Sequence, residues 1–151
     1  MSKVQLITHD LLDHLALSIS HAKSCYILTS FVMNSGVKML EPLLKEAVEN
    51  GADIKICTGD YLYITQPEAL KRLMDIHPEI EMRIWKSEGI SFHPKAYIFE
   101  NEAEGIFYIG SSNMSKSALT KGVEWNLVVA GEAEDTVVES VITEFLNVFH
   151  D

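Results

Sequence analysis

The feature that most constrains the fold of this chain is the regular alternation of two kinds of segment. Short runs dense in aliphatic and aromatic residues, such as Ser24–Val32 and Ala52–Gly59, have the length and composition of buried strands. Between them lie segments whose apolar residues recur at helical spacing, such as Asp10–Lys23. This alternation predicts an α/β fold in which a mixed β-sheet is flanked by helices on both faces.

The remaining elements follow the same two periodicities. A helix over Gly36–Asn50 is expected to close at Asn50-Gly51, and Pro42 is expected in its first turn. Other expected helices are Thr65–His77, Ser115–Gly122 and Glu134–Phe149. Other expected strands are Ile80–Trp85, Lys95–Phe99, Ile106–Gly110 and Val123–Gly131.

Length and composition indicate one globular domain over residues 1–151. The chain is 47% hydrophobic and 23% charged, and no apolar run approaches the length of a membrane span. Met1–Leu15 carries charged residues where a signal peptide needs an apolar core, so we expect a cytoplasmic protein that does not contact membranes. Cys25 and Cys57 lie inside apolar runs and are interpreted as buried thiols rather than as a disulfide or zinc ligands.

The net charge of −10 comes from 12 Lys and Arg against 22 Asp and Glu. A balance this acidic argues against non-specific nucleic-acid binding over the whole surface. The charge is uneven, however, because the chain from Gly122 to Asp151 contains no Lys or Arg. A local positive pocket is compatible with the cations that precede this stretch, which are Arg83, Lys86, Lys95, Lys116 and Lys121.

Polar side chains gather where two neighbouring strands are expected to meet. The runs Lys95–Phe99 and Ile106–Gly110 are joined by a short acidic segment, which predicts an antiparallel hairpin. His93 and Lys95 stand at the start of the first arm, and Ser111 and Asn113 follow the end of the second. In an antiparallel hairpin these two places are the same end, so the four side chains are expected to converge.

This set of residues suits chemistry on a phosphate. Histidine acts as a base, an acid or a nucleophile near neutral pH, and a strand would point His93 and Lys95 to the same face. The lysine would neutralise phosphate oxygens, while Ser111 and Asn113 would donate hydrogen bonds to them. Glu124, expected at the start of the next strand, could hold one imidazole nitrogen and fix its tautomer.

Each piece alone has a plainer interpretation. A His-x-Lys pair more often consists of exposed surface residues without a function than of catalytic residues, and Gly-Ser-Ser-Asn usually forms a turn. The Ser/Asn run before Met114 could also serve as the N-cap region of the short helix that follows. Only the joint order and spacing of the motifs favour a functional site.

That joint pattern resembles the phospholipase D superfamily, whose signature is His-x-Lys, four residues, Asp, and then Gly-Ser-x-Asn. Here the signature reads His93-Pro94-Lys95, four residues, Glu100, and then Gly110–Asn113. Glu124 occupies the place of the glutamate that orients the family's histidine. Glu100 stands where the family has aspartate, and the resemblance implies that it, with Gly110, supports the fold around the site.

The resemblance also implies a mechanism. Phosphodiester cleavage would proceed without metal or cofactor through a phosphohistidine intermediate, and the enzyme would be a nuclease acting on DNA rather than RNA. The family uses two His-Lys motifs per site. Among the six histidines only His93 has both a lysine two residues on and a Gly-Ser-x-Asn run downstream, whereas His21 has the lysine, Lys23, without that run. A homodimer with one shared site at its interface is therefore expected.

A second interpretation belongs to a different class of protein. The segments Ile27–Val32 and Thr58–Leu70 also look like those of N-terminal nuclease-like domains attached to superfamily II helicases. The chain could then be a catalytically silent nucleic-acid-binding or dimerisation module of a larger helicase-like protein. The acidic balance and Glu100 favour this alternative, whereas the intact His93 and Lys95 favour the enzyme.

Overall fold

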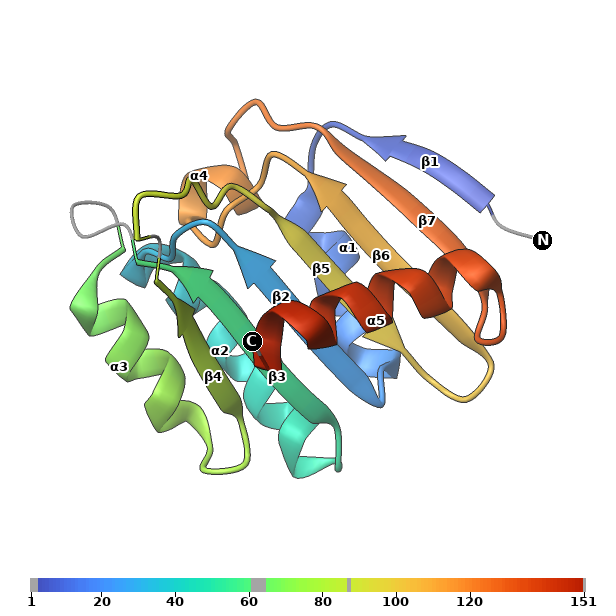
Figure 1. Ribbon diagram of the computed structural model, residues 1–151, viewed down its shortest axis with the longest axis horizontal. Coiled ribbons are helices and arrows are strands. Elements are labelled where there is room, and N and C mark those ends of the chain that lie inside the picture. The colour runs from blue at the N-terminus through green and yellow to red at the C-terminus, as the bar shows by residue number, and fades with distance from the viewer. Residues whose placement is uncertain (1–2, 61–64, 87, 151) are drawn as a thin grey trace.

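A computed structural model describes residues 3–60, 65–86 and 88–150 of the protein. Strands and helices alternate along the chain as the sequence predicts (Figure 1). The strands are β1 (Lys3–Ile7), β2 (Ser24–Thr29), β3 (Asp53–Gly59), β4 (Glu81–Trp85), β5 (Ala96–Glu100), β6 (Glu104–Gly110) and β7 (Asn126–Glu132). The helices are α1 (Leu11–His21), α2 (Asn34–Glu49), α3 (Pro67–Ile76), α4 (Lys116–Leu119) and α5 (Thr136–His150).

The seven strands form one mixed sheet in the order β1-β7-β6-β5-β2-β3-β4. Strands β2, β3 and β4 run parallel to one another, and every other neighbouring pair is antiparallel. The carboxyl ends of β2, β3, β4 and β6 therefore meet the amino ends of β5 and β7 at one edge of the sheet. We call this edge the site end, because the predicted site residues follow or precede these strands there.

Helices cover both faces of the sheet, which confirms the predicted architecture. One core packs α1, α2 and α3 against the sheet through side chains such as Leu15, Leu44 and Leu73. The opposite core packs α5 against the sheet through Phe145 and Phe149. Figure 1 shows α5 crossing the front of the sheet, with α1 and α2 behind it.

The first strand is an element that the sequence interpretation missed. Lys3–Ile7 pairs with β7 in antiparallel register, from Lys3 opposite Ala130 to Ile7 opposite Asn126. It is an edge strand whose first four residues are exposed, so no buried apolar pattern marks it. Its existence depends on a partner more than a hundred residues away in the chain, which local periodicity does not reveal.

The expectation that Pro42 lies in the first turn of its helix is wrong. Helix α2 begins at Asn34, two residues earlier than predicted, so Pro42 falls in the helix interior. Tertiary contacts set this start: the Asn34 N–H donates to Gln66 Oε1 at 2.7 Å, and Gly36 lies against the Met114 backbone. These contacts outweigh the hydrogen bond that an interior proline removes. Of the helicase-like segment Thr58–Leu70, residues 61–64 lie outside the described residues.

The two cysteines are buried free thiols, as predicted. Burial, with a smaller effect of Asp53, raises the pKa of the Cys25 thiol to about 12. Burial also raises the pKa of Cys57 to about 11, although nearby Arg83 opposes the rise. The reactive thiolate is therefore scarce at both positions near neutral pH.

We expect neither thiol to react with Ellman's reagent within minutes in the native protein at pH 8. Both thiols should react at once in denaturant, because unfolding removes the burial that keeps them protonated. The absorbance of the released thiolate measures both rates. Rapid native-state labelling of one equivalent would contradict the burial of that cysteine.

Candidate functional site

The β5–β6 hairpin brings the two predicted motifs together. Ala96 pairs with Ile109, and one residue beyond this pair the Gly110 N–H donates to the Lys95 carbonyl oxygen at 3.2 Å. The segment that carries His93 and Lys95 therefore runs beside the segment that begins at Ser111. The convergence of the two motifs at one end of the hairpin is present in the structure.

The segment from Ser91 to Lys95 is not a strand, contrary to the expectation that placed Lys95 in one. Strand β5 begins at Ala96, so the alternation of a strand does not decide where the two side chains point. Other contacts hold the segment: Phe92 is buried and stacks on Trp85 with ring centroids 4.6 Å apart, and Ser30 Oγ donates to the Pro94 carbonyl oxygen at 3.4 Å. His93 is exposed and Lys95 is half-buried between these anchors.

Asn113 is buried and ties the hairpin to the end of β2. Its Oδ1 atom accepts hydrogen bonds from the Ser30 N–H at 2.8 Å and from the Phe31 N–H at 3.1 Å. We call this pair of hydrogen bonds the Asn113 bridge. The amide oxygen only accepts, so the Nδ2 group is the part of this side chain that can donate to a phosphate.

Ser111 connects the end of β6 to the loop before β7. Its Oγ donates a short hydrogen bond to Glu124 Oε2 and accepts one from the Trp125 N–H at 3.0 Å. The Ser111 N–H donates in turn to the Trp125 carbonyl oxygen at 3.1 Å. Glu124 thus lies beside Ser111, in the loop before β7 rather than in the strand where it was expected, because β7 begins at Asn126. Its contact with an imidazole stays a prediction.

Glycine is required at position 110 because the loop that carries Glu124 and Trp125 passes directly against its backbone. A Cβ atom at this position would lie 2.0 Å from the Trp125 carbonyl oxygen, far inside van der Waals contact. Any larger residue would push the Glu124 loop away from Ser111. The predicted supporting role of Gly110 therefore has a physical basis in backbone approach.

A buried polar network beneath the site was missed by the sequence interpretation. Tyr97 donates through its hydroxyl to the Ser112 carbonyl oxygen at 3.1 Å, and Asn126 Nδ2 donates to Ser112 Oγ at 2.8 Å. Burial, with a smaller effect of Glu124, raises the pKa of Tyr97, so the phenol stays protonated and can donate. An amide at the head of the apolar run Asn126–Val129 was the signal that pointed to this network.

The alternative interpretation, in which the Ser/Asn run before Met114 caps the following helix, is wrong about the residue that caps it. Ser115 is the N-cap of α4, and its Oγ accepts a hydrogen bond from the Ala118 N–H at 3.2 Å. Ser111 and Asn113 make the contacts described above instead.

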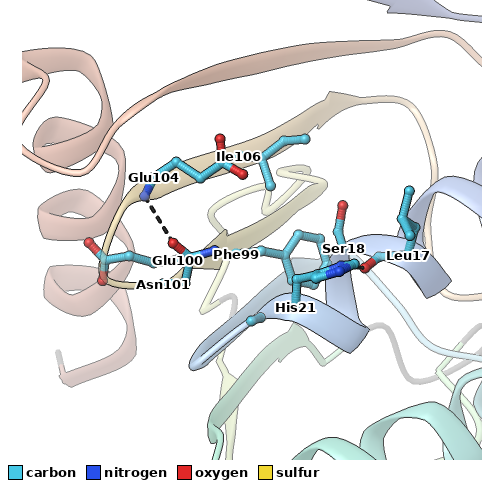
Figure 2. Close-up of a pocket in the computed structure, with 9 residues that line it drawn as sticks. Leu17, Ser18, His21, Phe99, Glu100, Asn101, Glu104 and Ile106 are labelled. Atoms are coloured by element: carbon cyan, nitrogen blue, oxygen red, sulfur yellow. Dashed lines mark hydrogen bonds between the residues drawn. The ribbon is translucent and has the colours of Figure 1, made fainter.

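Glu100 lies at the opposite end of β5 from Lys95. Five residues of extended chain separate them by roughly 16 Å. Glu100 lines a cavity of about 260 Å³ between the hairpin tip and α1, together with His21, Asn101 and Glu104 (Figure 2). Burial raises the pKa of its carboxyl group. The structure therefore does not bring Glu100 together with the other predicted site residues, and any support that it gives acts through the strand.

One small cavity at the site end has a volume of about 10 Å³ and is lined by residues that include His9, Glu124 and Asn126. A larger cavity of about 360 Å³ lies by the carboxyl end of β4 and is lined by residues that include Arg83, Trp85 and Lys86.

Within residues 3–60, 65–86 and 88–150, no group of three or more His, Cys, Asp or Glu side chains is placed to hold a metal ion. In the same part of the chain, none of the helices combines the length and the apolar character needed to cross a membrane.

The protein is an α/β domain with His-Lys and Ser-Asn motifs at one end of a mixed sheet, and comparison with known proteins identifies its family. Residues 15–149 match the protein-family model described as "Cardiolipin synthase, PLD-like domain". The chain therefore belongs to the phospholipase D-like family. None of the curated proteins compared with the chain matches it significantly.

Solved structures share the fold at low sequence identity. Nuc from Salmonella typhimurium, described as a phospholipase D family member, is 21% identical with a TM-score of 0.76, and the match covers 99% of this chain and 95% of that one. NucT from Helicobacter pylori is 16% identical with a TM-score of 0.73, covering 99% and 97%. The archaeal chromatin protein TrmBL2 is 15% identical with a TM-score of 0.61, covering 96% of this chain and 51% of that one.

The Asn113 bridge predicts a stability difference between two asparagines. Asn113→Ala leaves the Ser30 and Phe31 N–H groups without their acceptor in a buried place, so we expect a loss of about 2–4 kcal/mol in the free energy of unfolding. Asn101 Oδ1 also accepts two backbone N–H groups, at the exposed hairpin tip where water can replace it. Asn101→Ala should therefore cost well under half as much in urea unfolding.

Asn113→Asp provides the matched variant, because its carboxylate keeps an acceptor oxygen for the two N–H groups while the amide donor is lost. It should recover most of the stability lost in Asn113→Ala. Equal destabilisation by the two alanine variants would contradict the structural role assigned to the Asn113 bridge.

Proposed function

We propose that this chain is a metal-independent phosphodiesterase, and specifically a nuclease, that acts through a phosphohistidine intermediate at a site shared by two chains of a homodimer. The observation that carries the proposal is the hairpin contact between Lys95 and Gly110, which sets the His93 segment beside the Ser111–Glu124 pair. Membership in the phospholipase D-like family supports it. The proposed substrate is nucleic acid, and DNA rather than RNA.

The proposed chemistry assigns a role to each side chain. An imidazole nitrogen of His93 forms a bond to phosphorus while the bond from phosphorus to the leaving oxygen breaks. Lys95 neutralises the non-bridging oxygens, and the Asn113 amide nitrogen donates a hydrogen bond to them. Glu124, together with Ser111, positions these groups and fixes the histidine tautomer.

A second proton donor is needed to complete the reaction, and a second chain is the proposed source. The leaving oxygen takes a proton from the His93 imidazolium of the other chain. Water then returns a proton to that imidazole, attacks phosphorus and breaks the N–P bond, which restores both histidines. Another histidine at this end of the sheet, His9, follows β1, which lies three strand spacings or roughly 14 Å from β5. His9 also has no lysine two residues on, unlike His93, so it is not the proposed second donor.

Cleavage of single- or double-stranded DNA should survive an excess of EDTA, because the proposed nucleophile is an imidazole and no metal-bound water takes part. His93→Asn should abolish turnover and leave the thermal unfolding midpoint within a few degrees of wild type. Gel assays of DNA cleavage with and without chelator measure the first effect. Activity that vanishes in EDTA and returns with magnesium or zinc would contradict the phosphohistidine mechanism.

Dimers of wild-type and variant chains distinguish a site shared by two chains from an independent site in each chain. Wild-type and His93→Asn chains are unfolded together and refolded at wild-type fraction f. If each working site needs His93 from both chains, activity follows f squared and falls to about a quarter of wild type at equal mixing. If each chain carries its own site, activity follows f and falls to about a half. Pull-down of tagged chains checks that pairing is random, and a linear dependence would contradict the shared site.

The second candidate function is a silent nucleic-acid-binding module of a larger helicase-like protein. Glu100, which stands where the family has aspartate, favours it, since a departure from the motif is expected in a module that does not catalyse. TrmBL2, whose structure is described as a novel mode of DNA binding, has a similar fold. Wild-type protein that binds DNA without cleaving it, with binding unchanged in His93→Asn, would support the module and contradict the enzyme.

A further inference from the structure

The cavity by the carboxyl end of β4 combines apolar walls with positive charge. It has a volume of about 360 Å³, which is within the range of protein cavities that hold small ligands or parts of larger ones. We call it the Trp85 cavity. The residues that line it and enter the argument below are Arg83, Trp85, Lys86, Ile90, Val148 and Phe149.

Trp85 presents a fixed aromatic ring to this cavity. Phe92 stacks on the indole with ring centroids 4.6 Å apart and an interplanar angle of 15°, so it covers one face of the indole. Phe92 is itself buried, and its ring lies so close to Gly59 that a Cβ atom there would come within 3.1 Å of it. Trp85 lines the cavity and Phe92 does not, so the cavity meets the indole on a side that Phe92 leaves open.

The positive charge comes from the same strand and the residue after it. Arg83 and Trp85 are two residues apart in β4, so they point to the same face of the sheet. The Arg83 guanidinium lies over the Phe149 ring of α5, 5.3 Å from its centroid, and this contact orients it. Among the described residues that line the cavity, Arg83 and Lys86 are cations and Glu88 is the one acid, although the whole chain has a net charge of −10.

The Trp85 cavity adjoins the candidate site. Phe92, which stacks on Trp85, immediately precedes His93 in the chain. The carboxyl end of β4 also lies at the site end of the sheet, because β4 runs parallel to β3 and β2. In Figure 1 the carboxyl end of α5 lies over β3, beside β4 at the edge of the sheet. A long substrate bound at His93 can therefore reach the cavity.

We propose that the Trp85 cavity takes an unpaired base of a single-stranded DNA substrate whose scissile phosphate lies at His93. This inference rests on the proposed function and adds to it a preference for single strands. Aromatic side chains stack on the faces of bases, and basic side chains beside them hold the backbone of a single strand. Trp85 would supply the stacking surface, while Arg83 and Lys86 would neutralise phosphates next to the bound base.

Duplex DNA should not use this cavity. A base inside a duplex has both faces covered by its neighbours, and it must leave the stack before a side chain can stack on it. Binding of double-stranded DNA should therefore gain nothing from Trp85.

The first test measures the fluorescence of Trp85. The chain has two tryptophans, and Trp125→Phe, at a residue 62% exposed, leaves Trp85 as the single one. His93→Asn in the same chain removes the proposed nucleophile, so binding is measured without cleavage. A short single-stranded DNA of mixed sequence should quench the emission. The same strand in a blunt duplex, and thymidine monophosphate alone, should each need a concentration at least about 10-fold higher for half of that quenching.

The second test compares variants by their affinity for the same DNAs. Trp85→Ala should weaken binding of the single strand about 10-fold, the order that stacking of one base contributes, and leave binding of the duplex unchanged. Trp85→Phe keeps a ring against Phe92 and should recover most of the affinity. Arg83→Gln should lower the slope of log affinity against log salt by roughly 0.7, the value for one phosphate contact with a single strand. Arg72→Gln is the matched control, because it removes the same charge from α3, where Arg72 pairs with Glu41, and it should leave the slope unchanged.

Circular dichroism identifies variants that keep the fold. Should Trp85→Ala unfold, the quenching experiment and the two arginine variants decide, since neither alters Trp85. Equal quenching by the single strand and the duplex overturns the proposal, as does half-quenching by thymidine monophosphate at the concentration of strand that achieves it. An equal loss of both DNAs in folded Trp85→Ala also overturns it, because Trp85 would then only support the His93 segment.

The outcome for the cavity is separable from that for catalysis. If single-stranded DNA quenches Trp85 selectively and wild type cleaves no DNA in EDTA, the cavity stands and the proposed nuclease fails. If wild type cleaves DNA and Trp85→Ala binds the single strand as tightly as wild type does, the nuclease stands and the cavity is overturned. If both proposals hold, Trp85→Ala should raise KM for the single strand about 10-fold with little change in kcat.

Discussion

The interaction on which the site end depends is the Asn113 bridge. The Asn113 side chain accepts the N–H groups of Ser30 and Phe31, 83 and 82 residues earlier in the chain. Beside it, the Met33 N–H donates to the Met114 carbonyl oxygen at 2.9 Å, and Gly36 of α2 approaches the same backbone. The parallel half of the sheet and the hairpin half are thus joined by buried polar contacts at the site end. Leaving the N–H groups of Ser30 and Phe31 without an acceptor would cost free energy of folding. The bridge therefore fixes the position of the hairpin end that carries Asn113.

From this bridge the site is built by short connections. The hairpin sets Lys95 against Gly110, and the lack of a side chain at Gly110 lets the Trp125 backbone close over the end of β6. Ser111 and Glu124 then meet because their backbones are already neighbours. Tyr97 and Asn126 hold Ser112 from below, so the polar loop rests on a buried network rather than on solvent. Rigid support of this kind is what a group that must meet phosphorus in one orientation requires.

Local periodicity was sufficient to predict most of the fold and the meeting of the two motifs. Each buried strand and each amphipathic helix carries its identifying pattern in its own residues, and the hairpin is defined by two strands close together in sequence. The features that the sequence did not predict depend on residues distant in the chain. β1 is specified by β7, the start of α2 by Gln66 and Met114, and the position of Glu124 by Ser111. The bridging role of Asn113 also needs Ser30, which no spacing near the motif indicates.

The acidity of the chain, which argued against nucleic acid at the level of composition, is unevenly placed along the strands. The hairpin tip and the far end of β7 carry the acidic residues Glu100, Glu102, Glu104, Glu132 and Glu134. Lys95, Lys116 and Lys121 belong to the site end, seven strand residues or roughly 23 Å away along β6. The Debye length at physiological salt is about 8 Å, so the acidic end is screened from a phosphate bound at the site end. The charged groups at the site end include the three lysines together with Asp10 and Glu124, so the net charge of the whole chain is a poor guide to the ligand that this surface accepts.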